Sequence, residues 1–225
     1  VVYFNMGLCL DGIGYYSDAV DAYINALKMQ YNTPQVHANL ARVLANIGEF
    51  DAAVSHFAQA AKMNPSDRFL QQNMQSLQSF LDKCKTPERC MQISIDQKPD
   101  IPALRFKLGL IYEKQGKPDQ ALAVYEKILK EIGKSNRKLY LLVINRMATL
   151  HARKGEKEQS LQLLKEGIET VPDNPHFYYE IAAFYGALGE IKQSVAWLDM
   201  AIKKGYQNLA QINADNRLAS IRNTQ

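Results

Sequence analysis

The sequence predicts an all-α protein built from one helical hairpin that recurs along the chain. The clearest unit is residues 36–65, where apolar side chains recur at helical spacing on both sides of a break at Gly48. Pro65 ends the second helix, because proline cannot continue one. Neither helix can bury its apolar stripe alone, so we expect the hairpin to need neighbours. The two stripes are Val36, Leu40, Val43 and Leu44, then Ala53, Phe57 and Ala60.

Neighbouring hairpins appear at a spacing of 34 residues. One period earlier, the landmarks of the unit become Met6, Gly14, Tyr16, Ala19, Tyr23 and Ala26. Two periods later, Leu108, Gly109, Tyr112, Gly116, Ala121 and Tyr125 follow the pattern W-x2-L-G-x2-Y…A-x3-F, with Arg105 at the Trp position. These residues resemble the tetratricopeptide repeat (TPR) family over nearly the whole chain. The resemblance implies a right-handed superhelical solenoid whose first helices line a concave surface.

We expect about six repeats in a single solenoid domain that spans residues 1–225. The third repeat keeps the spacing but is degenerate, because Gln75, Asp82 and Pro87 replace its usual small residues. Residues 209–225 alternate apolar and polar side chains, which predicts an amphipathic capping helix. The expected repeats are about 1–33, 34–66, 67–101, 102–140, 141–174 and 175–208.

Two further segments carry structural predictions. In the third repeat we expect helices at about residues 67–83 and 87–97, with Thr86 as the cap of the second one. The next repeat is five residues longer than the period, and the extra residues fall at 133–138, which predicts a polar loop or an extra turn.

Composition and charge limit the classes of function. The net charge of +4 is too mild, without a supporting motif, to predict nucleic-acid binding. No apolar run is long enough to span a bilayer and no cleavable signal is present, so we expect no membrane insertion in this segment. Because the chain opens at Val1 inside the first helix, we expect an excised domain with further sequence upstream.

The three cysteines match no zinc-binding spacing, and we expect neither a metal nor a cofactor. Cys9 is predicted to be a small core residue. Cys84 and Cys90 flank a short turn, K-T-P-E-R, so they can form a disulfide or remain two free thiols. Free thiols favour the cytoplasm and a disulfide favours the periplasm.

Asparagine stands at the same first-helix position in three successive repeats, as Asn5, Asn39 and Asn73. A side-chain amide offers an acceptor and two donors, which match the groups of a peptide bond. A row of such amides can hold the backbone of an extended peptide without reading its sequence. The row resembles the asparagine ladder of the TPR region in O-linked N-acetylglucosamine transferases. The alternative is that these side chains are simply solvated.

The same position then becomes basic, at Lys107 and Arg146. We expect an electropositive groove that binds an acidic segment or a C-terminal carboxylate near these two residues. The arrangement is loosely similar to the carboxylate clamp of co-chaperone TPR domains, but Phe4 and Leu8 stand where that clamp needs Lys and Asn. A solvated basic face is the alternative. Also predicted on this surface are Arg42, Lys114, Asn145 and Arg153.

The sequence therefore predicts a protein-interaction scaffold or adaptor that binds an extended peptide in its groove. No nucleophile elbow, phosphate-binding loop or metalloprotease helix is present, so we expect no enzyme activity. Two alternatives stay open. One is an accessory domain that presents substrates to a larger bacterial enzyme, such as a membrane glycosyltransferase. The other is a structural module that forms homodimers. The tail that begins at Lys203 resembles the end of many bacterial TPR proteins, which favours a bacterial source.

Overall fold

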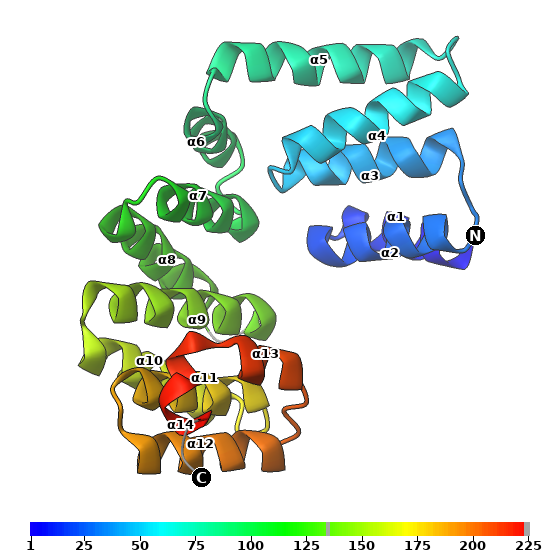
Figure 1. The fold of residues 1–225 in the computed structure, drawn as a ribbon. Coiled ribbons are helices and arrows are strands. Elements are labelled where there is room, and N and C mark those ends of the chain that lie inside the picture. The colour runs from blue at the N-terminus through cyan, green and yellow to red at the C-terminus, as the bar shows by residue number, and fades with distance from the viewer. Residues whose placement is uncertain (134–135, 223–225) are drawn as a thin grey trace. The chain divides into compact units, whose positions relative to one another are not determined.

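A computed structural model describes residues 1–133 and 136–222 of the chain. Over these residues it is all-α: the described part contains helices joined by turns and no strand (Figure 1). The chain forms two compact units, Val1–Val124 and Tyr125–Gln225, and each is described by itself. The prediction of a single solenoid domain therefore stays a prediction. No helix in the described part is long and apolar enough to cross a membrane.

Unit 1 consists of consecutive helices that pack on one another in chain order. α1 pairs with α2 and α3 pairs with α4, as the 34-residue period predicts. α8 contains the boundary between the two units. The helices are α1 (Val2–Gly12), α2 (Tyr16–Lys28), α3 (Pro34–Asn46), α4 (Phe50–Met63), α5 (Arg68–Cys84), α6 (Pro87–Gln97), α7 (Pro102–Lys114) and α8 (Pro118–Ile132).

Local sequence explains where these helices begin and end. The Thr33 side chain accepts a hydrogen bond from the backbone N–H of Val36, with Pro34 at the first helical position. Thr86 caps α6 in the same way. Gly48 follows α3 with φ +79°, and a Cβ at this position would lie 2.6 Å from Cε of Met91. The left-handed backbone therefore favours glycine at position 48, and a larger residue would also displace the flexible end of Met91.

The described core of unit 1 includes two separate clusters. The first joins α2, α3 and α4 through side chains such as Tyr23, Leu40 and Phe57, and Leu77 of α5 belongs to it. The second joins α6 to α7. The two helices of the degenerate third hairpin therefore contribute to different clusters. The buried members of the second cluster are Met91, Ile95, Leu104 and Leu108.

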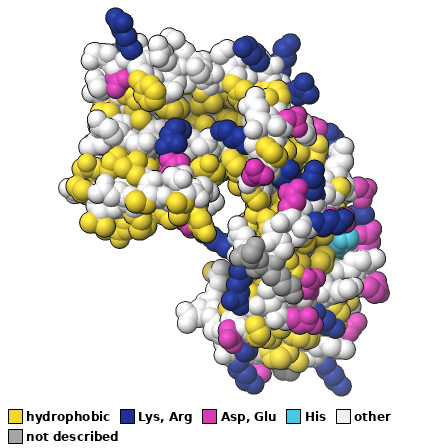
Figure 2. Space-filling view, turned by 180° about the vertical axis from the view of Figure 1, so that it is seen from behind, with side chains coloured by type: hydrophobic (Ala, Val, Ile, Leu, Met, Phe, Trp, Pro, Cys, Tyr) yellow, Lys and Arg dark blue, Asp and Glu magenta, His cyan; other side chains and the backbone are white. Residues whose placement is uncertain are grey.

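The first hairpin differs from its prediction in one respect. Cys9 is exposed, so its assignment to the core was wrong. α1 is the first helix of the structure and packs only on later helices, so one of its sides has no neighbour in unit 1. Large apolar side chains on this hairpin, including Val2, Met6 and Ile13, are likewise exposed, and hydrophobic side chains are visible on the surface in Figure 2.

Unit 2 continues the pattern of paired helices. α9 pairs with α10 and α11 pairs with α12. Of the segment at 133–138, residues 134–135 lie outside the described residues, and Arg137 begins α9. The helices are α9 (Arg137–Lys154), α10 (Lys157–Thr170), α11 (Pro175–Ala187), α12 (Ile191–Lys203), α13 (Leu209–Ala214), η1 (Asn216–Leu218) and α14 (Ala219–Arg222).

The C-terminal segment covers the last hairpin, as predicted, but it is divided into three short helices. Leu218 is fully buried against α11 and α12, in a cluster that includes Tyr179 and Ala201. The division occurs at Asp215, whose backbone is extended and whose side chain accepts from the N–H of Arg217. Asp215 thus ends α13 and caps η1, and a continuous helix is interrupted there.

Candidate functional site

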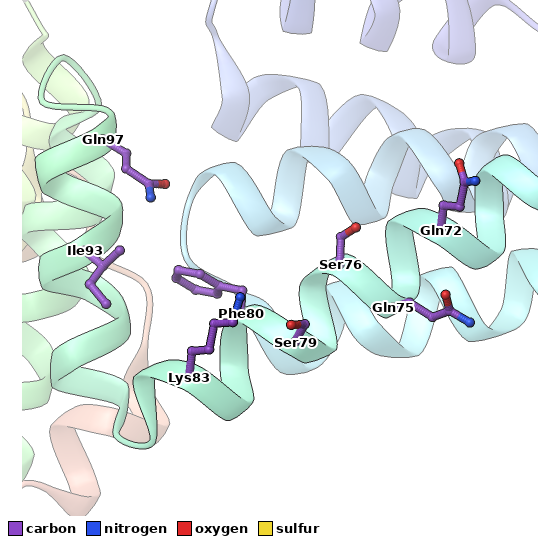
Figure 3. Close-up of a pocket in the computed structure, with 8 residues that line it drawn as sticks. All are labelled: Gln72, Gln75, Ser76, Ser79, Phe80, Lys83, Ile93 and Gln97. Carbon is purple, nitrogen blue, oxygen red and sulfur yellow. The ribbon is translucent and has the colours of Figure 1, made fainter.

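The third hairpin is open. α5 and α6 diverge from the turn that joins them (Figure 3), because each helix packs on a different neighbour. α5 buries Leu70, Leu77 and Cys84, which recur every seven residues on one side of the helix. The side of α5 toward α6 carries mostly polar residues, so beyond Phe80 it offers α6 little apolar surface to pack on. A pocket therefore opens where a regular hairpin would be closed.

This α5–α6 pocket has a volume of about 600 Å³. That volume lies within the range of small-ligand sites. Ile93 and Gln97 point from α6 toward α5 (Figure 3), while the remaining lining residues come from α5. Near the turn the lining includes the ring of Phe80, which packs against Phe50 with centroids 5.4 Å apart. The lining residues are Gln72, Gln75, Ser76, Ser79, Phe80, Lys83, Ile93 and Gln97.

The polar side chains of the α5–α6 pocket are available to a ligand. All six are exposed, and within residues 1–133 and 136–222 none has a side-chain hydrogen bond or ion pair. Gln72 and Gln75 each offer a carbonyl acceptor and two N–H donors. Each serine hydroxyl can donate one hydrogen bond and also accept hydrogen bonds. Lys83 adds a positive charge near the turn. The arrangement can therefore bond a polar chain without first breaking internal contacts.

A disulfide lies at the turn of the open hairpin. The Sγ atoms of Cys84 and Cys90 are 2.09 Å apart and join the end of α5 to the first turn of α6. Lys85 between them has φ +64°, in the left-handed region. The bond limits how far the two helices can move at the turn. The compartment that this bond favours stays a prediction.

The asparagines of the predicted row have different surroundings. Asn5 is exposed and Asn73 is half-buried on α5. The Asn39 Nδ2 donates to the backbone carbonyl of Gln35 at 2.9 Å, and its Oδ1 accepts from Arg42 at 3.4 Å. One member of the row thus has internal partners, and the ladder stays a prediction.

Two of the cations predicted to bind a partner form ion pairs within unit 1. Arg42 forks onto the buried carboxylate of Asp11, and Lys107 pairs with Glu49. Lys114 is exposed at the end of α7. The charge of the predicted basic face is therefore partly neutralised in unit 1.

The remaining predicted residues lie in unit 2. The Asn145 Nδ2 lies 3.3 Å from Nε2 of His176, and its Oδ1 is buried with no partner in the described part of the chain. Arg146 is half-buried. Because Lys107 belongs to unit 1 and Arg146 to unit 2, their joint action on a carboxylate stays a prediction.

The pocket residues were not predicted from the sequence, although a signal was present. Gln72, Gln75, Ser76, Ser79 and Lys83 form a polar stripe at spacings of three and four residues. One period earlier, the small residue Ala41 stands at the position of Gln75. The loss of the landmark at Gln75 was interpreted only as degeneracy.

The comparisons with known proteins agree with this architecture. Tetratricopeptide repeat models match residues 7–68 and residues 103–131. Both stretches of this chain therefore carry tetratricopeptide repeats. No curated protein sequence matches it. Among the described residues, no group of three or more His, Cys, Asp or Glu side chains could hold a metal ion.

Solved structures share the fold at low sequence identity. The APC/C hetero-tetramer Cut9-Hcn1 matches with a TM-score of 0.56 and 14% identity over 98% of this chain. This chain spans 41% of the matched Cut9-Hcn1 chain. A TPR protein from Parabacteroides merdae matches with a TM-score of 0.54 and 15% identity, over 98% of this chain and 83% of that one. YrrB, a TPR protein with an unusual peptide-binding site, matches with a TM-score of 0.50 and 15% identity. The match covers 87% of this chain and 98% of the YrrB chain. At these identities the likeness concerns the fold alone.

Proposed function

We propose that this protein is an interaction scaffold that captures an extended segment of a partner protein in the α5–α6 pocket. The observation that carries the proposal is the set of six exposed polar side chains that line the pocket and have no partner in the described residues. Their amide and hydroxyl groups complement the donors and acceptors of a peptide backbone. The TPR fold, whose members are protein-interaction scaffolds, supports the same class of function.

The lining of the pocket also favours particular side chains in the partner segment. An apolar side chain of the segment would contact Phe80 and Ile93 near the turn, and an acidic group would be favoured by Lys83. Asn73 follows Gln72 on α5 but is not among the residues that line the pocket. The disulfide holds the walls before binding, so the cost of ordering falls mainly on the partner segment.

A peptide array tests the proposal. Dodecamers with free and with amidated C termini are offered to the wild type, to the triple variant Gln72→Ala/Gln75→Ala/Ser79→Ala, and to Gln78→Ala as the control. Gln78 lies on the same helix but does not line the pocket, and among the described residues its side chain donates to the exposed Asp82. We expect the triple variant to bind about ten- to a hundredfold more weakly, since each lost hydrogen bond contributes roughly 1 kcal/mol.

The proposal fails if the triple variant binds the peptides as well as the control variant does. Equal binding by the triple variant and Gln78→Ala would show that the peptide binds elsewhere. A parallel variant, Asn5→Ala/Asn39→Ala/Asn73→Ala, separates the asparagine row from the pocket. The accessory-domain and homodimer alternatives remain predictions, and light scattering over a range of concentrations tests the second one.

A further inference from the structure

Unit 2 contains a second pocket of about 470 Å³, which the proposed function does not use. Its walls come from α9, α10, α11 and the capping helix η1. The apolar lining residues, which we call the floor, include Ala152, Leu164, Phe184 and Leu188. The charged lining residues, which we call the rim, are three cations, Arg153, Lys157 and Arg217, and one anion, Glu180. We call it the unit 2 pocket.

The three cations of the rim are not equivalent. Arg217 is held by Glu180, at 2.8 Å, and by Asp215, at 2.7 Å. Despite burial, these hydrogen bonds raise the pKa of Arg217 further above its ordinary value. Burial opposes the ionisation of Asp215, but hydrogen bonds from Arg217 and from Tyr179 outweigh it and lower its pKa to about 2. Arg217 is therefore held in the pocket wall, because Nε, Nη1 and Nη2 each already donate to a carboxylate.

Arg153 and Lys157 are the cations that a ligand can reach. Both are exposed, and within the described ranges neither forms an ion pair or a side-chain hydrogen bond. They flank the turn between α9 and α10, where Lys157 is the first residue of α10. The N-terminal end of a helix also favours negative charge. Two available cations at the rim of an apolar floor fit a group that is apolar at one end and anionic at the other.

We propose that the unit 2 pocket binds an apolar side chain that has a carboxylate beside it on the same segment of a partner protein. The apolar side chain contacts Leu164, Phe184 and Leu188, and the carboxylate pairs with Arg153 and Lys157. Asp and Glu side chains and a chain terminus supply the same carboxylate chemistry. The volume accommodates about two or three residues. The Thr149 hydroxyl in the lining donates to the backbone carbonyl of Asn145 and can still accept a hydrogen bond from a peptide N–H, which a long alkyl chain does not offer.

Four probes separate the sources of the carboxylate. Two are fluorescein-labelled pentapeptides, one ending in Leu-Glu with an amidated C terminus and one ending in Leu with a free C terminus. The third ends in Leu-Gln with an amidated C terminus and has no carboxylate. The fourth is octanoate, used as a competitor. Fluorescence anisotropy with the full chain measures binding of the labelled peptides.

We expect one or both carboxylate peptides to bind, and the Leu-Gln peptide to bind at least about tenfold more weakly. Whichever carboxylate peptide binds tighter identifies the source. Charge reversal in Arg153→Glu/Lys157→Glu should abolish binding, while Lys165→Glu on the same helix should leave it unchanged. Ala152→Phe should also weaken binding by filling the floor, and since Ala152 is exposed this variant is expected to fold.

Three outcomes would overturn the inference: equal binding of the Leu-Gln peptide, equal loss in Lys165→Glu and Arg153→Glu/Lys157→Glu, or competition by octanoate as strong as that of the peptides. The triple variant Gln72→Ala/Gln75→Ala/Ser79→Ala should keep full binding of these probes. Loss of the probes in that variant alone would move the site to the α5–α6 pocket. The inference on unit 2 would then fail while the proposed function stands.

Discussion

The guanidinium of Arg42 on α3 forks onto the carboxylate of Asp11 on α1, with an Nη1–Oδ1 distance of 3.2 Å. The Asp11 side chain is only 6% exposed, whereas that of Arg42 is 49% exposed. The pair ties the first repeat to the second. Arg42 was predicted to meet a partner peptide, and in the structure it also has this internal role.

Removal of the guanidinium should destabilise unit 1. Arg42→Ala leaves a nearly buried carboxylate without its partner, and we expect a loss of about 1–3 kcal/mol in the free energy of unfolding. Urea unfolding followed by circular dichroism measures it. The double variant Asp11→Asn/Arg42→Ala should recover part of the loss, because a neutral amide is less costly to bury. If the double variant is no more stable than Arg42→Ala, the ion pair does not explain the effect.

A pair of histidines should make stability depend on pH. The Nδ1 atoms of His37 and His56 are 2.8 Å apart, and Nε2 of His37 lies 2.8 Å from Oδ1 of Asn32. Burial lowers the pKa of His37, and burial together with the neighbouring His37 lowers that of His56, both from an ordinary value of 6.5. The unfolded chain therefore binds more protons than the folded chain near and below this value.

The folded chain should therefore lose stability as the pH falls. The contribution of the pair is complete above pH 6.5 and is lost as the pH falls below it. The midpoint of urea unfolding should thus be constant near pH 8 and decrease between about pH 6.5 and 5. His37→Gln/His56→Gln should be less sensitive over this range. An identical slope in the variant would assign the pH dependence to other groups.

Gly186 should be intolerant of a larger residue. A Cβ there would lie 2.5 Å from the backbone oxygen of Arg217 and 3.1 Å from Oγ of Ser194. Because the first of these atoms is backbone, the capping helix η1 would have to move. We expect Gly186→Ala to cost about 1–3 kcal/mol. At Gly12 nothing lies within 4 Å of the added Cβ, so Gly12→Ala should leave the thermal unfolding midpoint unchanged or slightly raised.

The number of cysteines that alkylation modifies, measured by mass spectrometry, shows whether the Cys84–Cys90 disulfide is present. Alkylation without reductant should modify only Cys9, and alkylation after reduction should modify all three cysteines. Reduction should also lower stability by about 2 kcal/mol, because the bond closes a loop with a sequence separation of 6. Three modified thiols without reductant would show that the bond is absent and would remove the argument for a periplasmic location.

The fold was largely predictable because the chain repeats its own pattern. Helices expected at 67–83 and 87–97 are observed at Arg68–Cys84 and Pro87–Gln97. Thr86 followed by Pro87 indicates the start of α6 by local chemistry alone. Such signals depend on neighbours in sequence, so they survive even in a degenerate repeat.

The candidate site was not predictable in the same way. A constant 34-residue period gives the length of a hairpin but not whether it is closed, and closure depends on which core each helix joins. Leu77 of α5 joins the cluster of α2 to α4, whereas Met91 of α6 packs with Leu104. The exposure of Cys9 was not predictable for a similar reason. It depends on which elements cover α1, and the pattern of α1 itself does not give that.

The central claim is that the α5–α6 pocket holds the partner segment, and its most direct test is a map of amide chemical shifts. The tightest peptide from the array is titrated into the isotopically labelled 225-residue chain. We predict that the largest shifts fall on Gln72, Gln75, Ser76, Ser79 and Gln97, and that Gln78 on the same helix moves little. Shifts confined to other helices, with α5 and α6 unaffected, would contradict the account.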